Sequence, residues 1–270
     1  MATHDSKDEV WYFAYGSNMR SSVLEGRGIR PLANRRAVIP SYVLTFDVFG
    51  VPYSEPAMAS IALRHSAATA RCTGKEAPPP VNGVAYLLSS QDFRTLVLSE
   101  GAGVAYTEVQ LEAYSADGAV PTASAAAEKH DTHHSQGDAA GVSFPVRTLV
   151  ARFPLRPNPM PSARYLSLLI DGAKEHQLPA EYQAHLEGLP SYHRQVGVSR
   201  RRDLGAQLFL GFWMPLLSWV MRRIKAASAK GSSTGHAPPY AGYVVAVLFN
   251  VMWCYHDWVH CHIWGQSGGR

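Results

Sequence analysis

The chain has 270 residues, of which 46% are hydrophobic and 17% are charged, with 25 Lys and Arg against 21 Asp and Glu. A chain this apolar can bury a core, so these numbers exclude disorder throughout. The length fits one domain with an appendage, or two small domains. Three cysteines are too few for a disulfide framework, and we therefore expect a reducing compartment.

The positive charge of the chain is confined to its last quarter. Residues 1–199 contain 17 Lys and Arg and 19 Asp and Glu, a net charge of −2. Residues 200–270 contain 8 Lys and Arg and 2 Asp, a net charge of +6, and are also the most hydrophobic part. A segment that is both basic and hydrophobic is typical of a membrane surface. The net negative charge of residues 1–199 argues against nucleic-acid binding.

The first ten residues are polar and acidic, without the basic and apolar regions of a signal peptide. This start predicts that the globular part of the chain faces the cytoplasm.

Runs of β-branched and aromatic residues predict the strands, and helical spacing with capping residues predicts the helices. The expected strands are residues 10–15, 38–49, 57–63, 82–88, 106–114 and 146–153. The expected helices are residues 20–30, 90–100, with Ser90 as N-cap, 162–176 and 178–189. Because strands outnumber helices and most connections are of hairpin length, we expect an α+β fold: a mixed β-barrel or sheet with covering helices.

A hydrophobic tail at residues 204–264 contains two uncharged stretches, 204–221 and 240–256. Pro215 breaks the first, and basic residues flank it, which favours a helix in the membrane interface or a re-entrant segment. The second is short for the ~20 residues that span a bilayer, although flanking aromatic residues could extend it. We expect this tail to associate with a membrane; a hydrophobic helical extension packed on the domain is the alternative.

Two groups of histidines and cysteines raise the question of a metal site. They are His130, His133 and His134, and Cys254, His256, His260, Cys261 and His262. The first group lies in residues 115–143, a segment rich in Ala, Ser, Gly and Asp that we expect to be a flexible insertion. The second group is irregularly spaced, although His256 and His260 are one helical turn apart. We therefore predict neither a metal nor a cofactor.

The most specific string in the chain is Tyr12-Phe13-Ala14-Tyr15-Gly16-Ser17-Asn18. A strand that runs into Gly-Ser-Asn leaves successive backbone N–H groups pointing into a turn. Such a turn favours a carboxylate or a developing oxyanion. On the residues alone, an ordinary turn after an edge strand is the better interpretation.

This string resembles the signature of the gamma-glutamylcyclotransferase family. Residues 83–100 resemble the strand-and-helix block of the family, which ends at its catalytic Glu-Gly, and residues 165–182 resemble its terminal helical block. The matches occur in the family's order and cover most of residues 10–192. The resemblance implies the small mixed barrel of the family as a catalytic domain at residues 10–195, followed by the tail.

The resemblance also implies an activity. Family members convert a gamma-glutamyl compound into 5-oxoproline by intramolecular aminolysis, which needs a base to deprotonate the attacking ammonium group but no metal. The resemblance assigns the base to Glu100, a substrate contact to Tyr165, and the substrate loop to the string above. Tyr106 matches a further family tyrosine only when one residue is gapped.

The extended architecture resembles fungal cyclotransferases of gliotoxin-type epipolythiodioxopiperazine biosynthesis, which implies a glutathione adduct as the small-molecule substrate. Two alternatives stay open. One is a cyclotransferase that acts on free glutathione or a gamma-glutamylamine. The other is a non-enzymatic, membrane-tethered binding protein of the same fold, against which the presence of Glu100 argues.

Overall fold

The computed structural model describes residues 9–64, 78–101, 103–115, 142–155, 158–193, 197, 199–231 and 237–265. Nearly all of the expected insertion, with its three histidines, lies outside these residues.

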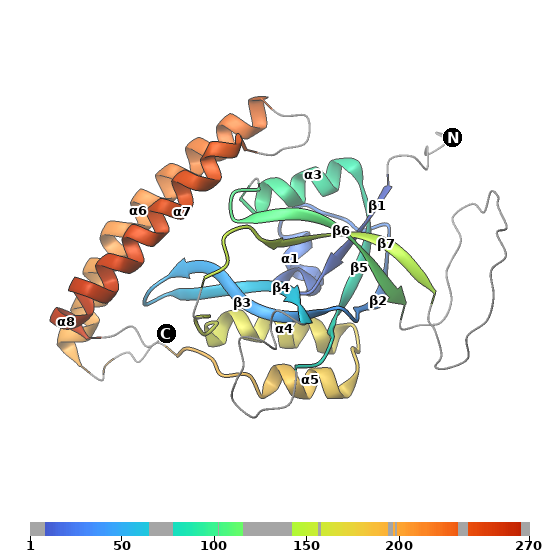
Figure 1. Cartoon of the computed structure of the whole chain (residues 1–270), viewed down its shortest axis with the longest axis horizontal. Helices are drawn as coiled ribbons and strands as arrows, with labels where there is room; N and C mark the ends of the chain where they lie inside the picture. The colour runs from blue at the N-terminus through green and yellow to red at the C-terminus, as the bar shows by residue number, and fades with distance from the viewer. Residues whose placement is uncertain are drawn as a thin grey trace.

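Five strands close into a barrel in the order β1-β5-β2-β6-β7 (Figure 1). They are β1 (Glu9–Ala14), β2 (Ala33–Ile39), β5 (Val81–Ser89), β6 (Tyr106–Ser115) and β7 (Ser143–Ala151). The neighbouring strands are antiparallel, except that β1 and β7 close the barrel in parallel at Tyr12 and Arg147. A Cβ on Gly83 would lie 2.2 Å from the Ala14 carbonyl oxygen, so only glycine allows β5 to approach β1 this closely.

A separate hairpin, β3 (Tyr42–Val51) and β4 (Glu55–Leu63), extends from the barrel towards the C-terminal helices (Figure 1). The single strand expected at residues 38–49 is wrong, because Pro40 and Ser41 form a turn that ends β2 and starts β3. Most of β2 escaped prediction because its polar residues obscure the pattern. One of them, Arg35, is nonetheless buried, with its guanidinium carbon 3.9 Å from the ring centre of Trp11.

Short helices follow β1 and cover the barrel. After the 3₁₀ helix η2 (Ser17–Met19), α1 (Ser21–Glu25) ends earlier than expected, and Gly28 has a φ of 77°. The N-cap of α3 (Ser90–Ser99) is Ser89, one residue before the predicted Ser90; its hydroxyl accepts a hydrogen bond from the Asp92 N–H at 3.1 Å. Helices α4 (Ala163–Glu175) and α5 (Ala180–Glu187) lie on another side of the barrel (Figure 1).

The tail is a helical hairpin. Helix α6 (Arg200–Gly231) runs antiparallel to α7 (Pro239–Tyr255), which continues through η3 (His256–His260) and α8 (Cys261–Trp264) (Figure 1). Pro215 lies inside α6, so the break expected there does not occur. Among the described residues, one helix, over Arg200–Ser228, is long and apolar enough to cross a membrane, and 28% of its most apolar window is buried.

The inner face of this C-terminal hairpin packs on the rest of the protein. One buried cluster joins Tyr53, in the β3–β4 turn, to residues of α6 and α7 that include Phe209 and Trp253. A second cluster joins Phe49 and Val104 to Ala241, Val245 and Ala246 of α7. The tail is therefore docked along β3 and on the segment that follows α3.

Candidate active site

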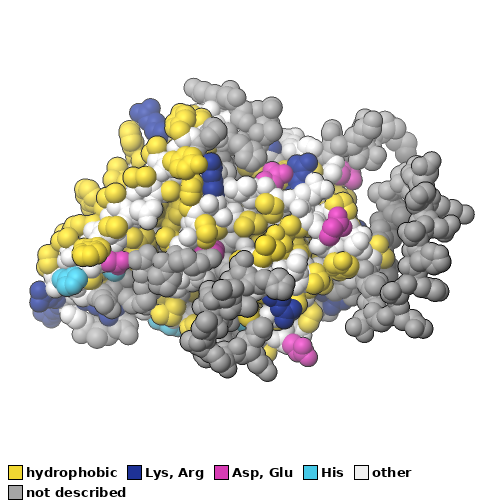
Figure 2. Space-filling model, viewed as in Figure 1, with side chains coloured by type: hydrophobic (Ala, Val, Ile, Leu, Met, Phe, Trp, Pro, Cys, Tyr) yellow, Lys and Arg dark blue, Asp and Glu magenta, His cyan; other side chains and the backbone are white. Residues whose placement is uncertain are grey.

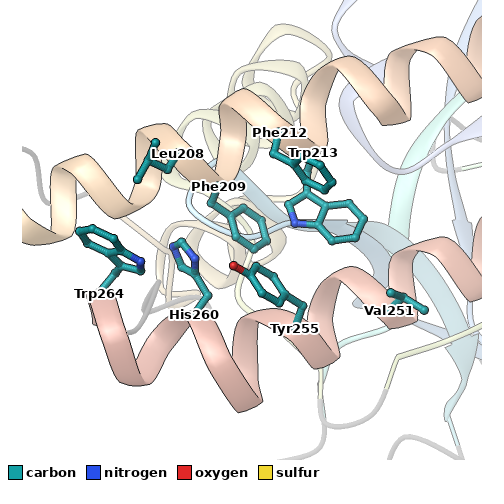
Figure 3. Close-up of a pocket in the computed structure, with 8 residues that line it drawn as sticks. All are labelled: Leu208, Phe209, Phe212, Trp213, Val251, Tyr255, His260 and Trp264. Carbon is teal, nitrogen blue, oxygen red and sulfur yellow. The ribbon is translucent and has the colours of Figure 1, made fainter.

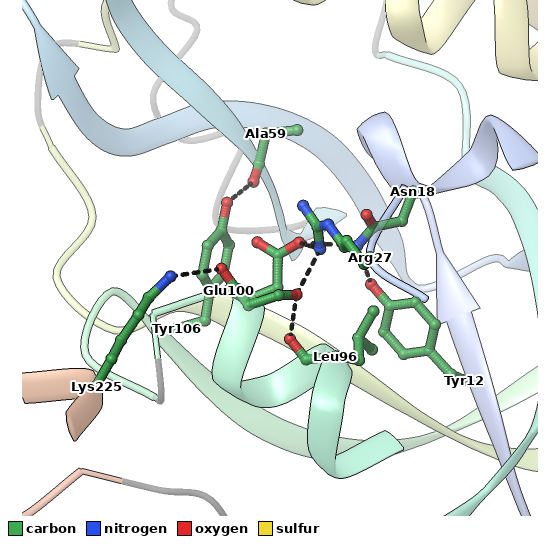
Figure 4. A network of polar contacts seen from close by, with 9 residues as sticks. Tyr12, Asn18, Arg27, Ala59, Leu96, Glu100, Tyr106 and Lys225 are labelled. Carbon is green, nitrogen blue, oxygen red and sulfur yellow. Dashed lines mark hydrogen bonds and ion pairs between the residues drawn. The ribbon is translucent and has the colours of Figure 1, made fainter. Parts of the chain in front are cut away.

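Glu100 is the C-terminal cap of α3 and lies where several distant segments meet (Figure 4). Its Oε1 accepts a hydrogen bond from Asn18 Nδ2 at 3.0 Å and forms an ion pair with Arg27. Arg27 also donates to the Ser99 hydroxyl at 2.9 Å. The carboxylate is therefore held by the turn after β1 and by the segment after α1.

The Gly16-Ser17-Asn18 turn owes its position to α4. The hydroxyl of Ser162 caps α4 by accepting from the N–H of Tyr165 at 3.0 Å. Gly16 allows the Tyr165 ring to lie against the turn, because a Cβ there would be 3.3 Å from its hydroxyl oxygen. Farther along α4, a Cβ on Gly172 would lie 2.8 Å from the backbone N of Arg20, just after the turn. Glycine at both positions lets helix and turn touch.

Four buried tyrosines surround the Glu100 carboxylate: Tyr12, Tyr15, Tyr106 and Tyr165. Ala59 of β4 holds two of them through its backbone, since its carbonyl accepts from the Tyr106 hydroxyl at 3.0 Å and its N–H donates to the Tyr165 oxygen at 3.1 Å. The Tyr12 hydroxyl accepts from Asn18 Nδ2 at 3.0 Å, the same group that bonds Glu100.

These residues enclose a small cavity. Its walls are Tyr12, Tyr15, Gly16, Ser17, Asn18, Ala59, Glu100, Tyr106, Leu149 and Tyr165. The volume is about 20 Å³, room for about one water molecule, whereas ligand sites usually measure roughly 300–1,000 Å³. A ligand of amino-acid size is therefore larger than this cavity.

Proteins similar in sequence to this chain are named as enzymes. The chain is 40% identical over 274 residues to gamma-glutamyl cyclotransferase gliK of Aspergillus fumigatus, covering 100% of this chain and 93% of that protein. It is 33% identical over 263 residues to gamma-glutamyl cyclotransferase aclK of Aspergillus oryzae, covering 96% and 90% of the two chains. The chain belongs to the gamma-glutamyl cyclotransferase family. The resemblance inferred from the sequence is confirmed.

Two further comparisons describe the parts of this cyclotransferase. Residues 199–263 match the family model described as the AclK C-terminal domain. The crystal structure of a human protein, described as uncharacterized protein loc79017, superposes with a TM-score of 0.51 at 18% identity, covering 74% of this chain and 99% of that chain. The barrel with covering helices and a helical tail confirms the predicted fold class.

Burial sets the protonation of the cyclotransferase cavity. It raises the pKa of all four tyrosines, and the negative charge of Glu100 raises each pKa further. The pKa of Tyr165 rises from 10.0 to about 12. All four hydroxyls therefore keep their protons at neutral pH, and those of Tyr15 and Tyr106 donate them to the carbonyls of Leu149 and Ala59.

The structure brings together most of the residues that the sequence assigned to the site. Glu100, Tyr165 and the loop residues Tyr12, Tyr15, Gly16, Ser17 and Asn18 all line the cavity, as does Tyr106. Phe13 and Ala14 are fully buried in the barrel and do not line it.

Sequence reasoning missed Arg27, Ala59 and Leu149. Arg27 is an isolated arginine after a short helix, and no pattern in the sequence distinguishes it. Ala59 was expected in a strand, but it acts through backbone atoms that every residue has.

The C-terminal hairpin contacts the segment that carries Glu100, the residue expected to be the base. Lys225 Nζ of α6 donates to the Ser99 carbonyl at 3.5 Å (Figure 4), and a Cβ on Gly101 would meet the Met221 methyl at 3.4 Å. Val104 is fully buried against α7. Glu100 thus lies between two residues, Ser99 and Gly101, that touch the tail.

The histidines of the tail have partners of their own. His256 Nδ1 lies 2.7 Å from an Asp257 carboxylate oxygen, and His260 Nε2 donates to the Gly205 carbonyl at 3.1 Å. In the part of the chain that the structure describes, no three His, Cys, Asp or Glu side chains are grouped as they are around a metal ion.

Proposed function

We propose that this enzyme converts a gamma-glutamyl compound into 5-oxoproline and a free amine. The α-ammonium group of the substrate gives a proton to Glu100, and its nitrogen then attacks the γ-carbonyl carbon. A lactam C–N bond forms, the bond from the γ-carbon to the leaving nitrogen breaks, and the leaving nitrogen takes up a proton. The observation that carries this proposal is the Glu100 carboxylate in the wall of a cavity edged by protonated tyrosines.

The remaining catalytic requirements are orientation and charge stabilisation. The substrate supplies its own nucleophile, so the protein has to fold the flexible glutamyl chain into the reactive conformation and stabilise the oxyanion. The turn at Gly16-Ser17-Asn18 and the hydroxyls of Tyr12 and Tyr165, which accept hydrogen bonds from Asn18 and from the Ala59 N–H, are the groups that we assign to these tasks.

We propose a glutathione adduct as the substrate, on the pathway to a fungal epipolythiodioxopiperazine of the gliotoxin type. The support is that the resemblance to such cyclotransferases extends over the whole chain, tail included, and covers the relatives gliK and aclK almost completely. Free glutathione and gamma-glutamylamines are the competing substrates.

We also propose that the tail, residues 204–264, associates with a membrane while the catalytic domain, residues 10–195, faces the cytoplasm. The net charge of +6 over residues 200–270, the two uncharged stretches and the length of α6 support this placement.

The test of the activity is the release of 5-oxoproline from a gamma-glutamyl amino acid, from glutathione and from a glutathione S-conjugate. We expect the S-conjugate to be the best substrate. Glu100→Gln should lower the rate by about 100- to 10,000-fold, since it removes the base. The matched control is Glu112→Gln, an exposed carboxylate on β6, which should leave the rate unchanged.

The outcomes separate the alternatives. If glutathione is turned over faster than its S-conjugate, the proposed substrate is wrong and the reaction class stands. If none of the three compounds yields 5-oxoproline, the binding protein is the better description. A Glu100→Gln variant with full activity would remove the assignment of the base.

A further inference from the structure

The outer face of the C-terminal hairpin carries a long apolar surface. It is defined here by Leu208, Phe212 and Trp219 of α6, and by Val247, Val251 and Trp258 of α7 and η3. On each helix the three residues follow the spacing i, i+4, i+11, which places them on one side. Their exposed fractions reach 63% for Phe212, 62% for Val247 and 81% for Trp258. Figure 2 shows hydrophobic side chains gathered over this part of the molecule.

This face also carries a groove between the two helices (Figure 3). The groove has a volume of about 520 Å³, and its walls include the exposed side chains of Leu208, Phe212, Val251 and Tyr255. An apolar groove open to the outside of the protein accepts hydrocarbon chains but offers few hydrogen-bonding groups to a polar partner.

On α6, charged residues lie at the ends of the apolar stretch and not within it. Residues 204–221 contain no Lys, Arg, Asp or Glu, a charge-free length of about 27 Å of helix. Basic residues flank this length, Arg200 and Arg201 at one end, Arg222 and Arg223 at the other, and all four are exposed. An apolar face with basic ends and exposed tryptophans matches an anionic lipid surface, with hydrocarbon below and phosphates at the edges.

The inner face of the hairpin decides how it can meet a bilayer. Near one end, the Tyr53 hydroxyl donates to the Gly265 carbonyl at 2.7 Å, and Trp253 Nε1 donates to the Gly50 carbonyl at 2.9 Å. Near the other end, Val104 and Val245 belong to one buried cluster. Because the catalytic domain contacts the hairpin near both ends, a spanning orientation would pull polar parts of that domain into hydrocarbon.

From this geometry we propose that the hairpin lies flat in one leaflet of an anionic membrane, outer face down, and holds the catalytic domain against the surface without spanning the bilayer. The proposal rests on the membrane association proposed above and specifies its partner and its orientation.

The first test is flotation of the full chain with vesicles of phosphatidylcholine alone or with about 30% phosphatidylserine. We expect the chain to bind the anionic vesicles and to bind the neutral ones at least tenfold more weakly. Added salt should remove most of the extra binding to the anionic vesicles. Phe212→Glu and Val247→Glu should abolish binding. The matched control is Leu32→Glu, an equally exposed leucine outside the hairpin (51% exposed), which should bind normally.

The second test measures depth. A nitroxide attached to Val247→Cys, with the three native cysteines replaced by serine, should lie about 5–10 Å below the headgroups. In a spanning hairpin the same probe would lie near the midplane, about 15 Å deep. A midplane depth overturns the flat orientation and leaves membrane association intact.

Two other outcomes overturn the proposal completely. If the chain binds no vesicles but dimerises in sedimentation, and Phe212→Glu abolishes the dimer, the face is an interface between copies of the chain. If it binds no vesicles and remains a monomer, membrane association itself fails. Formation of 5-oxoproline by the same samples, measured without vesicles, tests the catalytic proposal separately.

Discussion

At the residue scale, the contact between Arg27 and Glu100 is the least expected feature of the site. Both side chains are mostly buried, with exposed fractions of 25% and 18%, so the ion pair is shielded from water on most sides. Its bond to the Ser99 hydroxyl ties the guanidinium to the end of α3 as well. We therefore assign Arg27 as a positioning residue that acts through Glu100.

Arg27→Met should lower kcat by about 10- to 100-fold, because a displacement of roughly 1 Å of a catalytic group has an effect of that size. The variant keeps about the length of the side chain and removes its charge, so kcat should fall while KM stays nearly unchanged. Arg27→Lys should restore part of the rate. The control is Arg30→Met, an exposed arginine three residues on. An unchanged kcat in Arg27→Met, or a KM that rises as much as kcat falls, would contradict the assignment.

At the scale of elements, the C-terminal hairpin has two faces with different tasks. Its inner face contacts Ser99 and Val104, which precede and follow the proposed base in the sequence, and Arg152, just after β7, donates to the Gly103 carbonyl at 3.3 Å. A loop held by these contacts loses less conformational entropy when substrate binds. The tail is thus part of the support of the active site, whatever its outer face contacts.

Val245→Ala removes inner-face methyl groups from the cluster that holds Val104 and should lower the free energy of unfolding by about 1–2 kcal/mol. We expect kcat to fall several-fold with KM nearly unchanged, because the base moves while the substrate turn does not. Val247→Ala makes the same change on the outer face and should alter neither value in solution. Equal effects of the two substitutions on kcat would show that the inner contact is irrelevant to catalysis.

At the scale of the whole molecule, the buried tyrosines make stability depend on alkaline pH. The pKa of Tyr165 is about 12 in the folded protein and about 10 in the unfolded chain, so folding holds its proton more tightly. Its contribution to stability is complete below pH 10 and is lost as the pH rises from 10 through about 12. Tyr12, Tyr15 and Tyr106 act in the same direction.

Urea unfolding at a series of pH values should show a constant free energy from these tyrosines up to about pH 10, followed by a decline of about 1.4 kcal/mol per pH unit for each tyrosine. Tyr165→Phe should make the decline less steep by about 1.4 kcal/mol per pH unit, the contribution of one tyrosine. A free energy that stays level to pH 11.5 in the wild-type chain would mean that the hydroxyls reach water in the folded state.

Much of the barrel and of the site followed from local sequence. Runs of β-branched and aromatic residues predicted β1, β5, β6 and β7, and helical spacing placed α3 and α4 within one or two residues. The prediction failed at β2, whose buried Arg35 depends on rings from two other strands, and at the turn of Pro40. It also failed at Pro215, which was expected to interrupt the first tail segment but lies inside a continuous helix.

The sequence by itself determined the family, the candidate base Glu100 and the confinement of positive charge to the tail, because each is carried by a motif or by composition. Only the tertiary structure decided that Arg27 and Ala59 belong to the site, since both depend on contacts between segments far apart in the chain. It alone also decided which side of the tail is exposed. A hydrophobic helix has the same composition whether it is buried or open, and the docking of its inner face on Phe49, Tyr53 and Val104 distinguishes the two.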